Sequence, residues 1–237
     1  MQQRPAGAEI NLARGEPGKL TVWGDLKDMK LFYFDIYGRA ESIRFLLSHA
    51  KVKYENIHVN GDSMNDLKTS GKLEFGQVPM LETKDGLHLC QSWAILRFLG
   101  RKLGYYPDDL DTAWKIDSTI DAAEDYFNTY FKFNFESVES IKAANKENWL
   151  KLVPVWINAI EKRITSNGGK FVAGNKITIA DFAVAAVAFN LLLNEANPHH
   201  ADVHPLVKDH VVFQKYTQLL KESLGEHLSK RPQPRPF

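Results

Sequence analysis

Cysteine is nearly absent from this sequence, since Cys90 is the only one in 237 residues. A single cysteine excludes an internal disulfide and any CxxC dithiol pair, so we expect a reducing compartment and a cytoplasmic location. An excess of either charge is also absent, because 30 lysines and arginines face 29 acidic residues, for a net charge of +1. This balance argues against a dedicated nucleic-acid binder, which needs a clustered cationic surface.

The sequence also lacks a hydrophobic run long enough to cross a membrane. The most apolar stretch, residues 177–193, is interrupted by Thr178, Asp181 and Asn190, whereas a spanning helix needs about 20 predominantly apolar residues. We therefore interpret this stretch as the central core helix of a soluble protein. Thr178 and Asp181 have the spacing of a capping box at its start.

The first 28 residues contain arginines and prolines and no continuous apolar segment, so we expect no secretory signal. We interpret residues 1–28 as a flexible extension. Met29, directly before the first expected strand, is a candidate for a natural start.

The chain changes character near residue 104. Before it, strand and helix signals alternate, and after it the pattern is helical, which predicts an α/β domain over residues 29–105 and an all-helical domain over residues 106–237. Expected strands cover 31–34, 54–59, 78–81 and 87–89; expected helices cover 39–50, 93–103, 109–135, 147–166, 177–193 and 211–228.

Pro79 stands inside the third expected strand and has two interpretations. It can mark an edge strand, because proline cannot donate a ladder hydrogen bond. Alternatively, a cis peptide bond before Pro79 turns the backbone outward, so that Val78 can pair with an extended peptide.

Four side chains of metal-binding type, His199, His200, Asp202 and His204, follow Asn197-Pro198 in a stretch typical of a loop. Their spacing matches no metal motif known to us, and we predict no metal there.

Three stretches in fixed order carry a family resemblance: KLFYFDIYGRAE at 30–41, FGQVPML at 75–81 and QSWAILRFL at 91–99. Together with the capping box they resemble the soluble glutathione transferases. Tyr33 at the end of the first strand and Lys230-Arg231-Pro232 are most similar to the sigma class, which includes the haematopoietic prostaglandin D synthases. The resemblance covers about residues 29–237 and implies a thioredoxin-like first domain, a helical second domain and a homodimer.

The resemblance implies that Tyr33 and Arg39 are catalytic. A free thiol has a pKa of about 8.5, so little of it is the reactive thiolate at neutral pH. The Tyr33 hydroxyl would donate a hydrogen bond to the sulfur of glutathione and favour the anion, with Arg39 as a nearby cation.

The resemblance also implies a set of glutathione-binding residues. Ser92 opens a helix, whose free N–H groups suit the γ-glutamyl carboxylate, while Lys68 and Lys72 are alternative partners for the glycine carboxylate. Asp125 is expected to reach the glutathione of the neighbouring subunit. The full set is Phe34, Met64, Lys68, Lys72, Gln77, Val78, Pro79, Gln91, Ser92 and Asp125.

An apolar wall for the electrophile is expected from Ile36, Tyr37, Phe127, Tyr130 and Phe131. Lys132 stands near the position of a substrate-stacking tryptophan in the prostaglandin synthases, which favours a general electrophile.

An acidic trio, Asp121, Glu124 and Asp125, resembles the cluster that binds Mg²⁺ or Ca²⁺ in those synthases. We nevertheless predict no metal site there.

We therefore predict an enzyme that conjugates reduced glutathione to hydrophobic electrophiles, with no nucleic-acid or membrane partner. One alternative is a glutathione-dependent prostaglandin D synthase isomerase. The other is a non-catalytic relative, either a crystallin-like protein or a ligand carrier, which has no need of a thiolate.

Overall fold

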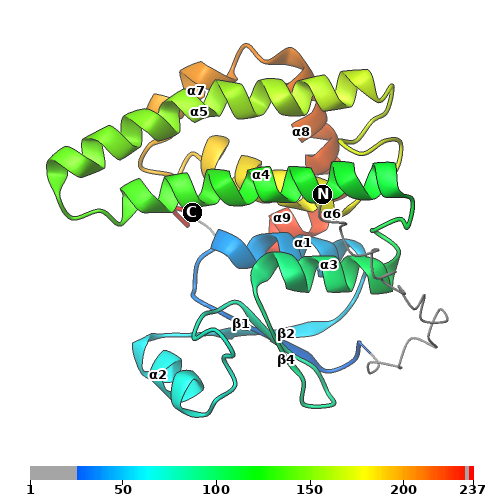
Figure 1. The fold of residues 1–237 in the computed structure, drawn as a ribbon, viewed down its shortest axis with the longest axis vertical. Helices are drawn as coiled ribbons and strands as arrows, with labels where there is room; N and C mark the ends of the chain where they lie inside the picture. Colours follow the sequence, from blue (N-terminus) through cyan, green and yellow to red (C-terminus); the bar gives the residue numbers. More distant parts are fainter. Residues whose placement is uncertain (1–25, 233–234) are drawn as a thin grey trace, which may run out of the picture.

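The computed structural model describes residues 26–232 and 235–237. A mixed sheet with its helices comes first, and a larger layer of helices follows (Figure 1). The extension expected over residues 1–28 lies outside the described residues, except for its last three.

A four-stranded sheet forms the base of the first domain, in the order β2-β1-β3-β4. Its strands are β1 (Met29–Tyr33), β2 (Tyr54–His58), β3 (Met80–Glu82) and β4 (His88–Cys90). β1 runs parallel to β2 and antiparallel to β3, which pairs antiparallel with β4. Alternate residues of β1, Met29, Leu31 and Tyr33, are buried on one face, as the period of a strand requires.

The helices of the first domain are α1 (Glu41–His49), which follows the 3₁₀ helix η1 (Gly38–Ala40), α2 (Gly61–Thr69) and α3 (Ser92–Leu103). Figure 1 shows α1 and α3 between the sheet and the second domain. This is the thioredoxin-like arrangement that the resemblance implied. The Val78–Pro79 peptide bond is cis, and β3 begins after it at Met80.

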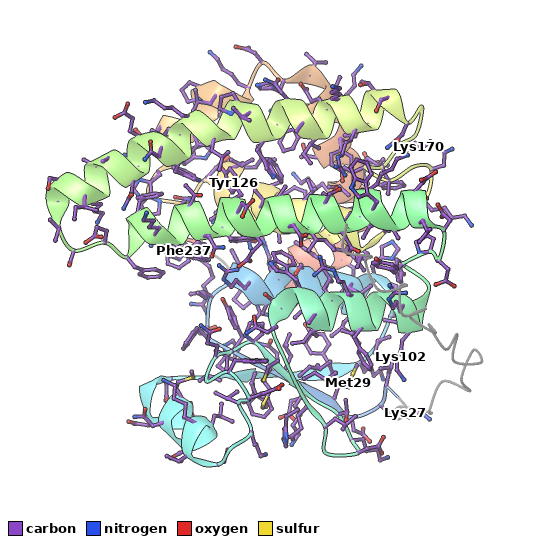
Figure 2. The ribbon with its side chains drawn as sticks, viewed as in Figure 1. Lys27, Met29, Lys102, Tyr126, Lys170 and Phe237 are labelled. Atoms are coloured by element: carbon purple, nitrogen blue, oxygen red, sulfur yellow. The ribbon has the colours of Figure 1, made fainter. Side chains whose placement is uncertain are left out.

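The second domain is helical, as predicted. Its helices are α4 (Leu110–Asn134), α5 (Glu139–Ser166), α6 (Ile179–Val187), α7 (His200–Val207), α8 (Val211–Ser223) and α9 (Gly225–Lys230). α4 packs against both α5 and α6. Tyr126 of α4 points toward α5 (Figure 2), where its ring centroid lies 5.3 Å from that of Trp156.

Every residue of α6 is buried, so the prediction of a central core helix is confirmed. Its capping box is also present, since the Asp181 carboxylate accepts a hydrogen bond of 2.8 Å from the backbone N–H of Thr178. The same carboxylate accepts a hydrogen bond of 2.6 Å from the Tyr216 hydroxyl. The helix continues into a π-helical turn, Ala188–Leu192. In the part of the chain that the structure describes, no helix combines the length and the apolar content that a bilayer span requires.

Three helix predictions need correction. The helix expected to begin at residue 147 begins at Glu139, since its first two turns are too polar to show a hydrophobic period. The supposed loop around His204 is α7, whose Val203 and Val207 are buried one turn apart, so tertiary packing stabilises a helix too short to be recognised alone. The single helix expected over 211–228 is two, α8 and α9, with Leu224 between them.

Candidate active site

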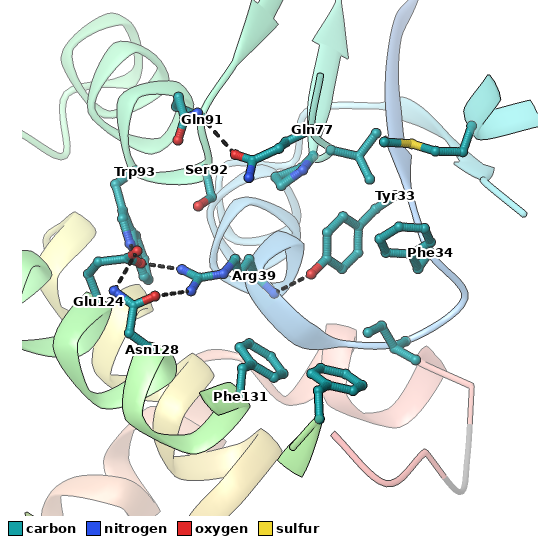
Figure 3. A pocket seen from close by; sticks show the side chains of 15 residues that line it. Tyr33, Phe34, Arg39, Gln77, Gln91, Ser92, Trp93, Glu124, Asn128 and Phe131 are labelled. Carbon is teal, nitrogen blue, oxygen red and sulfur yellow. Dashed lines mark hydrogen bonds and ion pairs between the residues drawn. The ribbon is translucent and has the colours of Figure 1, made fainter. Parts of the chain in front are cut away.

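A cavity of about 420 Å³ lies where the end of β1, the segment before β3, the start of α3 and the inner face of α4 meet (Figure 3). The sheet domain supplies most of its wall and α4 supplies the rest. Its lining residues are Tyr33, Phe34, Ile36, Arg39, Met64, Gln77, Val78, Pro79, Gln91, Ser92, Trp93, Glu124, Asn128, Phe131 and Phe135.

Tyr33 is 4% exposed and borders this cavity from the end of β1. Its hydroxyl oxygen accepts a hydrogen bond of 3.0 Å from the backbone N–H of Arg39. Burial raises the pKa of Tyr33, although the Arg39 N–H and the charges of Arg39 and Arg44 partly oppose this. The phenol therefore keeps its proton at neutral pH, and among the described residues no acceptor takes that proton. It is available to a ligand in the cavity.

Gly38 allows Tyr33 to occupy this position. Its φ of +45° lies in the left-handed region, which residues with a Cβ rarely adopt. A Cβ on Gly38 would also lie 2.6 Å from the Tyr33 hydroxyl oxygen. No side chain can therefore replace this glycine without moving the phenol.

The guanidinium of Arg39 turns away from Tyr33 and crosses to α4. It forms an ion pair with the Glu124 carboxylate and donates to Asn128 Oδ1 at 2.8 Å. The Trp93 indole N–H donates to the same Glu124 carboxylate at 2.5 Å. Arg39 was expected as a cation near the sulfur; in the structure its guanidinium is paired with Glu124, and its backbone N–H is the group that reaches Tyr33.

The opposite wall of the cavity has the features of an anion and peptide site. α3 begins at Ser92, which is buried and borders the cavity, so the first backbone N–H groups of the helix are available to an anion there. The Gln91 amide donates to Gln77 Oε1 at 3.5 Å. β3 pairs with β1 only from Met80 onward, which leaves Val78 outside the ladder and free to pair with an extended peptide.

Three expected glutathione contacts lie outside the cavity. Lys72 Nζ donates to Glu82 Oε2 at 2.8 Å, and Lys68 is exposed on α2. Asp125 is exposed on α4. Neither lysine lines the cavity in this structure, whereas Met64 does.

Tyr37, expected in the electrophile wall, faces another way. It is 2% exposed, and its hydroxyl donates to the Pro232 carbonyl at 2.5 Å. Its ring lies 4.0 Å from the guanidinium carbon of Arg231. The chain turns after β1, so Ile36 faces the cavity and Tyr37 faces the C-terminal segment.

Phe127 and Tyr130 are fully buried and do not line the cavity. Tyr130 packs into the core against Trp149, at 5.2 Å between ring centroids. Of the residues expected in the electrophile wall, Ile36 and Phe131 line the cavity, and Phe135 is an additional apolar lining residue.

Sequence reasoning missed four lining residues, Trp93, Glu124, Asn128 and Phe135. The spacing of Phe131 and Phe135 places them one turn apart on a helix, which could have predicted that both face the cavity. Glu124 and Asn128 share the same spacing, but their partner, Arg39, lies in another domain.

The carboxylates of the acidic trio do not converge. Asp121 accepts from Arg97 at 2.8 Å, while Glu124 pairs with Arg39. Within residues 26–232 and 235–237, no group of three or more His, Cys, Asp or Glu side chains could hold a metal ion.

Comparisons with known proteins agree on one family. The model of the glutathione S-transferase N-terminal domain matches residues 29–101, and that of the C-terminal domain matches residues 124–224. Glutathione S-transferase alpha-4 of Rattus norvegicus is 31% identical over 210 residues, which cover 86% of this chain and 91% of the relative.

Two solved structures are also similar. The prostaglandin synthase D of Nilaparvata lugens has a TM-score of 0.75 and 27% identity and covers 87% of this chain and 100% of its own. The glutathione S-transferase from Ascaris lumbricoides has a TM-score of 0.72 and 26% identity, with 89% and 100% covered. These similarities confirm the fold and the family, but they do not separate the sigma class from the alpha class.

Proposed function

Since this chain belongs to the cytosolic glutathione S-transferase family, we propose that it conjugates reduced glutathione to hydrophobic electrophiles at the cavity beside Tyr33. Glutathione is the co-substrate of this family, and the N-terminal domain binds it. The observation that supports the proposal most is the protonated Tyr33 hydroxyl: its oxygen accepts from Arg39 N–H, while its hydrogen has no acceptor among the described residues.

Thiol activation follows from that geometry. A hydrogen bond from Tyr33 to the sulfur stabilises the thiolate more than the thiol. A bond to a charged acceptor contributes about 1.5–3 kcal/mol, which corresponds to a fall of roughly one to two units in the thiol pKa. The thiol of bound glutathione then has a pKa of about 6.5–7.5 and is partly ionised at neutral pH, its proton passing to water. The thiolate attacks the electrophile while Tyr33 keeps its own proton.

Both reactants are held side by side, which supplies the rest of the rate enhancement. Val78 pairs with the cysteinyl unit of glutathione, and Ser92 at the start of α3 binds the γ-glutamyl carboxylate, with Gln77 and Gln91 beside it. The electrophile lies against Ile36, Phe131 and Phe135. This wall is apolar and open, since Phe135 is 68% exposed, and it favours no single substrate shape.

We also propose a homodimer. Phe75, two residues before the cavity-lining Gln77, is 58% exposed, and a large exposed ring there favours a second chain covering it. In a dimer, the exposed Asp125 could reach the partner's glutathione, and Lys68 or Lys72 could turn toward the glycine carboxylate. Family membership and the single cysteine support a cytoplasmic location.

A prostaglandin D synthase isomerase of the sigma class is the second candidate. The similarity to the Nilaparvata lugens structure favours it, whereas the alpha-class relative favours conjugation. A non-catalytic carrier is disfavoured, because it does not need a buried phenol at the edge of the cavity.

Conjugation of a chlorodinitrobenzene by the dimer, with Tyr33→Phe as the variant, tests the proposal. We expect kcat to fall about 10- to 100-fold, the range that a lost hydrogen bond to a charged group predicts, while the Kd of glutathione changes less than about twofold. Ultraviolet titration of bound glutathione should show thiolate forming at a lower pH in the wild type than in Tyr33→Phe.

Tyr105→Phe is the matched control, since it also removes one hydroxyl bond, to His49 Nδ1 at 2.7 Å, but lies outside the cavity. It should retain full turnover. Unchanged kcat in Tyr33→Phe, or an unshifted thiol titration in the wild type, would contradict thiol activation by Tyr33. A wild type that turns over prostaglandin H2 but not the chlorodinitrobenzene would favour the isomerase.

A further inference from the structure

The first cavity, which Tyr33 borders, differs in charge from a second cavity of about 220 Å³ that shares only Ile36 with it. Four lysines and arginines and two carboxylates line the second cavity. Among the described residues, the first cavity is lined by one permanent cation, Arg39, and by one carboxylate, that of Glu124. The lining of the first cavity is therefore electrically balanced, although it contains two charged side chains.

Glu124 compensates the charge of Arg39 directly, because the two side chains form an ion pair across the domain boundary (Figure 3). The same carboxylate accepts hydrogen bonds from the Trp93 indole N–H and from Asn128 Nδ2, the latter at 3.1 Å. Three donors thus bind one carboxylate, and hydrogen bonds to a charged acceptor are stronger than those between neutral groups. This arrangement fixes Glu124 opposite the guanidinium.

Arg39 has further contacts that do not depend on the charge of Glu124. Its guanidinium donates to Asn128 Oδ1 at 2.8 Å, and its Cζ lies 5.5 Å from the centre of the Phe131 ring and 5.9 Å from that of Phe127. A guanidinium over an aromatic face within about 6 Å is attracted to the ring. Removal of the Glu124 charge alone would therefore leave a cation beside Phe131, against which the electrophile packs in the proposed function.

This balance bears on which electrophiles the cavity accepts. A carboxylate that enters a site loses hydration, and this loss is tolerated only where a cation or hydrogen-bond donors replace the water. Arg39 is already paired, and the rest of the electrophile wall is apolar, from Ile36, Phe131 and Phe135. On the basis of the proposed conjugation, we propose that Glu124 determines specificity: by compensating the charge of Arg39, it restricts the first cavity to uncharged electrophiles.

A purely structural role for Glu124, as a link between α4 and the first domain, has a different consequence. Loss of that link would lower the turnover of charged and uncharged electrophiles alike. A change in the ratio of their rates, in contrast, requires a change of charge at the site. This ratio is therefore the quantity to measure.

Two electrophiles of nearly the same shape provide the test, 4-chloro-3,5-dinitrobenzamide and 4-chloro-3,5-dinitrobenzoate. At neutral pH they differ by one negative charge, on the side of the ring opposite the carbon that the thiolate attacks. Each kcat/KM is divided by the rate constant for the uncatalysed reaction with glutathione, which removes the difference in intrinsic reactivity. For the wild type, we expect the corrected value to be at least about fivefold higher for the amide.

Glu124→Gln keeps the shape of the side chain and removes its charge, so Arg39 becomes an uncompensated cation. We expect the preference for the amide to fall about three- to tenfold, as one unit charge a few ångströms away in a partly exposed site predicts. Glu124→Asp keeps the charge. It should retain the wild-type preference within about twofold, while the turnover of both electrophiles can fall together.

Asp117→Asn is the matched control. Asp117 also lies on α4 and pairs with an arginine of the first domain, since it accepts from Arg97 Nε of α3 at 2.7 Å, but it does not line the cavity. Loss of this ion pair weakens a comparable link between the domains without changing the charge of the cavity. The preference for the amide should therefore stay within about twofold of the wild type.

An unchanged ratio in Glu124→Gln would overturn the assignment of Glu124, as would an equal change of the ratio in Asp117→Asn. A wild type that does not prefer the amide would overturn it too. These outcomes leave the proposed function intact, because conjugation is still observed. A wild type that conjugates neither electrophile faster than free glutathione does would contradict the proposed function, and the role of Glu124 with it.

Discussion

At the scale of single residues, the position of one phenol depends on the absence of a side chain five residues later. Gly38 combines a φ of +45° with a contact so close that its missing Cβ would overlap the Tyr33 hydroxyl. The next residue, Arg39, donates its backbone N–H to the same oxygen. The turn after β1 thus fixes the hydroxyl on two sides and leaves its hydrogen to the cavity.

Gly38→Ala should therefore lower kcat by more than its loss of folding stability accounts for. We expect kcat for a chlorodinitrobenzene to fall at least about tenfold, since displacing a reacting group by a fraction of an ångström is costly. The free energy of unfolding should fall by about 1–3 kcal/mol from the strained φ and the clash.

Gly86→Ala is the control for this change. Gly86 has a φ of +79°, but a Cβ added there would meet nothing within 4 Å, so it shares the backbone penalty without touching Tyr33. If both variants keep full kcat, Gly38 does not position the phenol.

At the scale of elements, the C-terminal segment holds the loop after β1 in place. Tyr37 forms two of these contacts: its hydroxyl donates to the Pro232 carbonyl, and its backbone N–H donates to the Phe237 carbonyl at 3.0 Å. In a third contact, Arg235 pairs with Asp35. The Phe237 ring lies 6.0 Å from that of Phe131, below the end of α4 (Figure 2). A segment distant in sequence thus supports the wall of the first cavity.

Tyr37→Phe separates this role from the electrophile contact first expected of Tyr37. Because the hydroxyl loses its hydrogen bond to the Pro232 carbonyl and the one from the Arg235 backbone, we expect the free energy of unfolding to fall by about 1–2 kcal/mol. The KM for the electrophile should stay within about twofold, whereas Phe131→Ala should raise it. Denaturant unfolding and steady-state kinetics measure the two effects. A raised KM in Tyr37→Phe would indicate that Tyr37 contacts the electrophile after all.

The success of sequence reasoning differs between elements for physical reasons. α6 was predictable because a capping box precedes a run of apolar residues, so its signal is local. α7 was not, because packing of Val203 and Val207 stabilises it rather than propensity. Tyr33 and Ser92 were located through their motif, but no periodicity tells which way Tyr37 points in an irregular loop.

At the scale of the whole molecule, two charged clusters connect the domains. Arg39 of the first domain pairs with Glu124 of α4. Glu41 of α1 pairs with Arg231, which follows α9, and with His227 of α9. Such contacts join residues more than 80 positions apart and leave no local pattern, which is why Glu124 and Asn128 escaped prediction as parts of the site.

Glu41 should make stability depend on pH in the acid range. Burial raises the pKa of its carboxyl, but the hydrogen bond from His227 and the charges of His227, Arg44 and Arg231 outweigh burial and lower the pKa to about 2. Unfolded Glu41 takes up a proton near its ordinary value of 4.5. The carboxylate therefore stabilises the fold above this value, and its contribution is lost as the pH falls toward 2.

We expect Glu41→Gln to lower the free energy of unfolding by about 3 kcal/mol at neutral pH. The difference from the wild type should shrink as the pH falls from about 4.5 toward 2, which denaturant unfolding at several pH values can measure. Glu226→Gln removes an exposed carboxylate, which pairs with Lys51 and Lys230, and serves as the control, with little expected effect. A difference that does not change with pH would show that the charge of Glu41 is not what stabilises the fold.

The two halves of the first cavity come from different stretches of polypeptide. The groups around Tyr33 lie between β1 and the start of α3, while Phe131 and Phe135 lie on and just beyond the last turns of α4. Under the proposed function, mutations near the end of α4 would change the range of electrophiles that the cavity accepts and leave the stretch that carries Tyr33 unaltered.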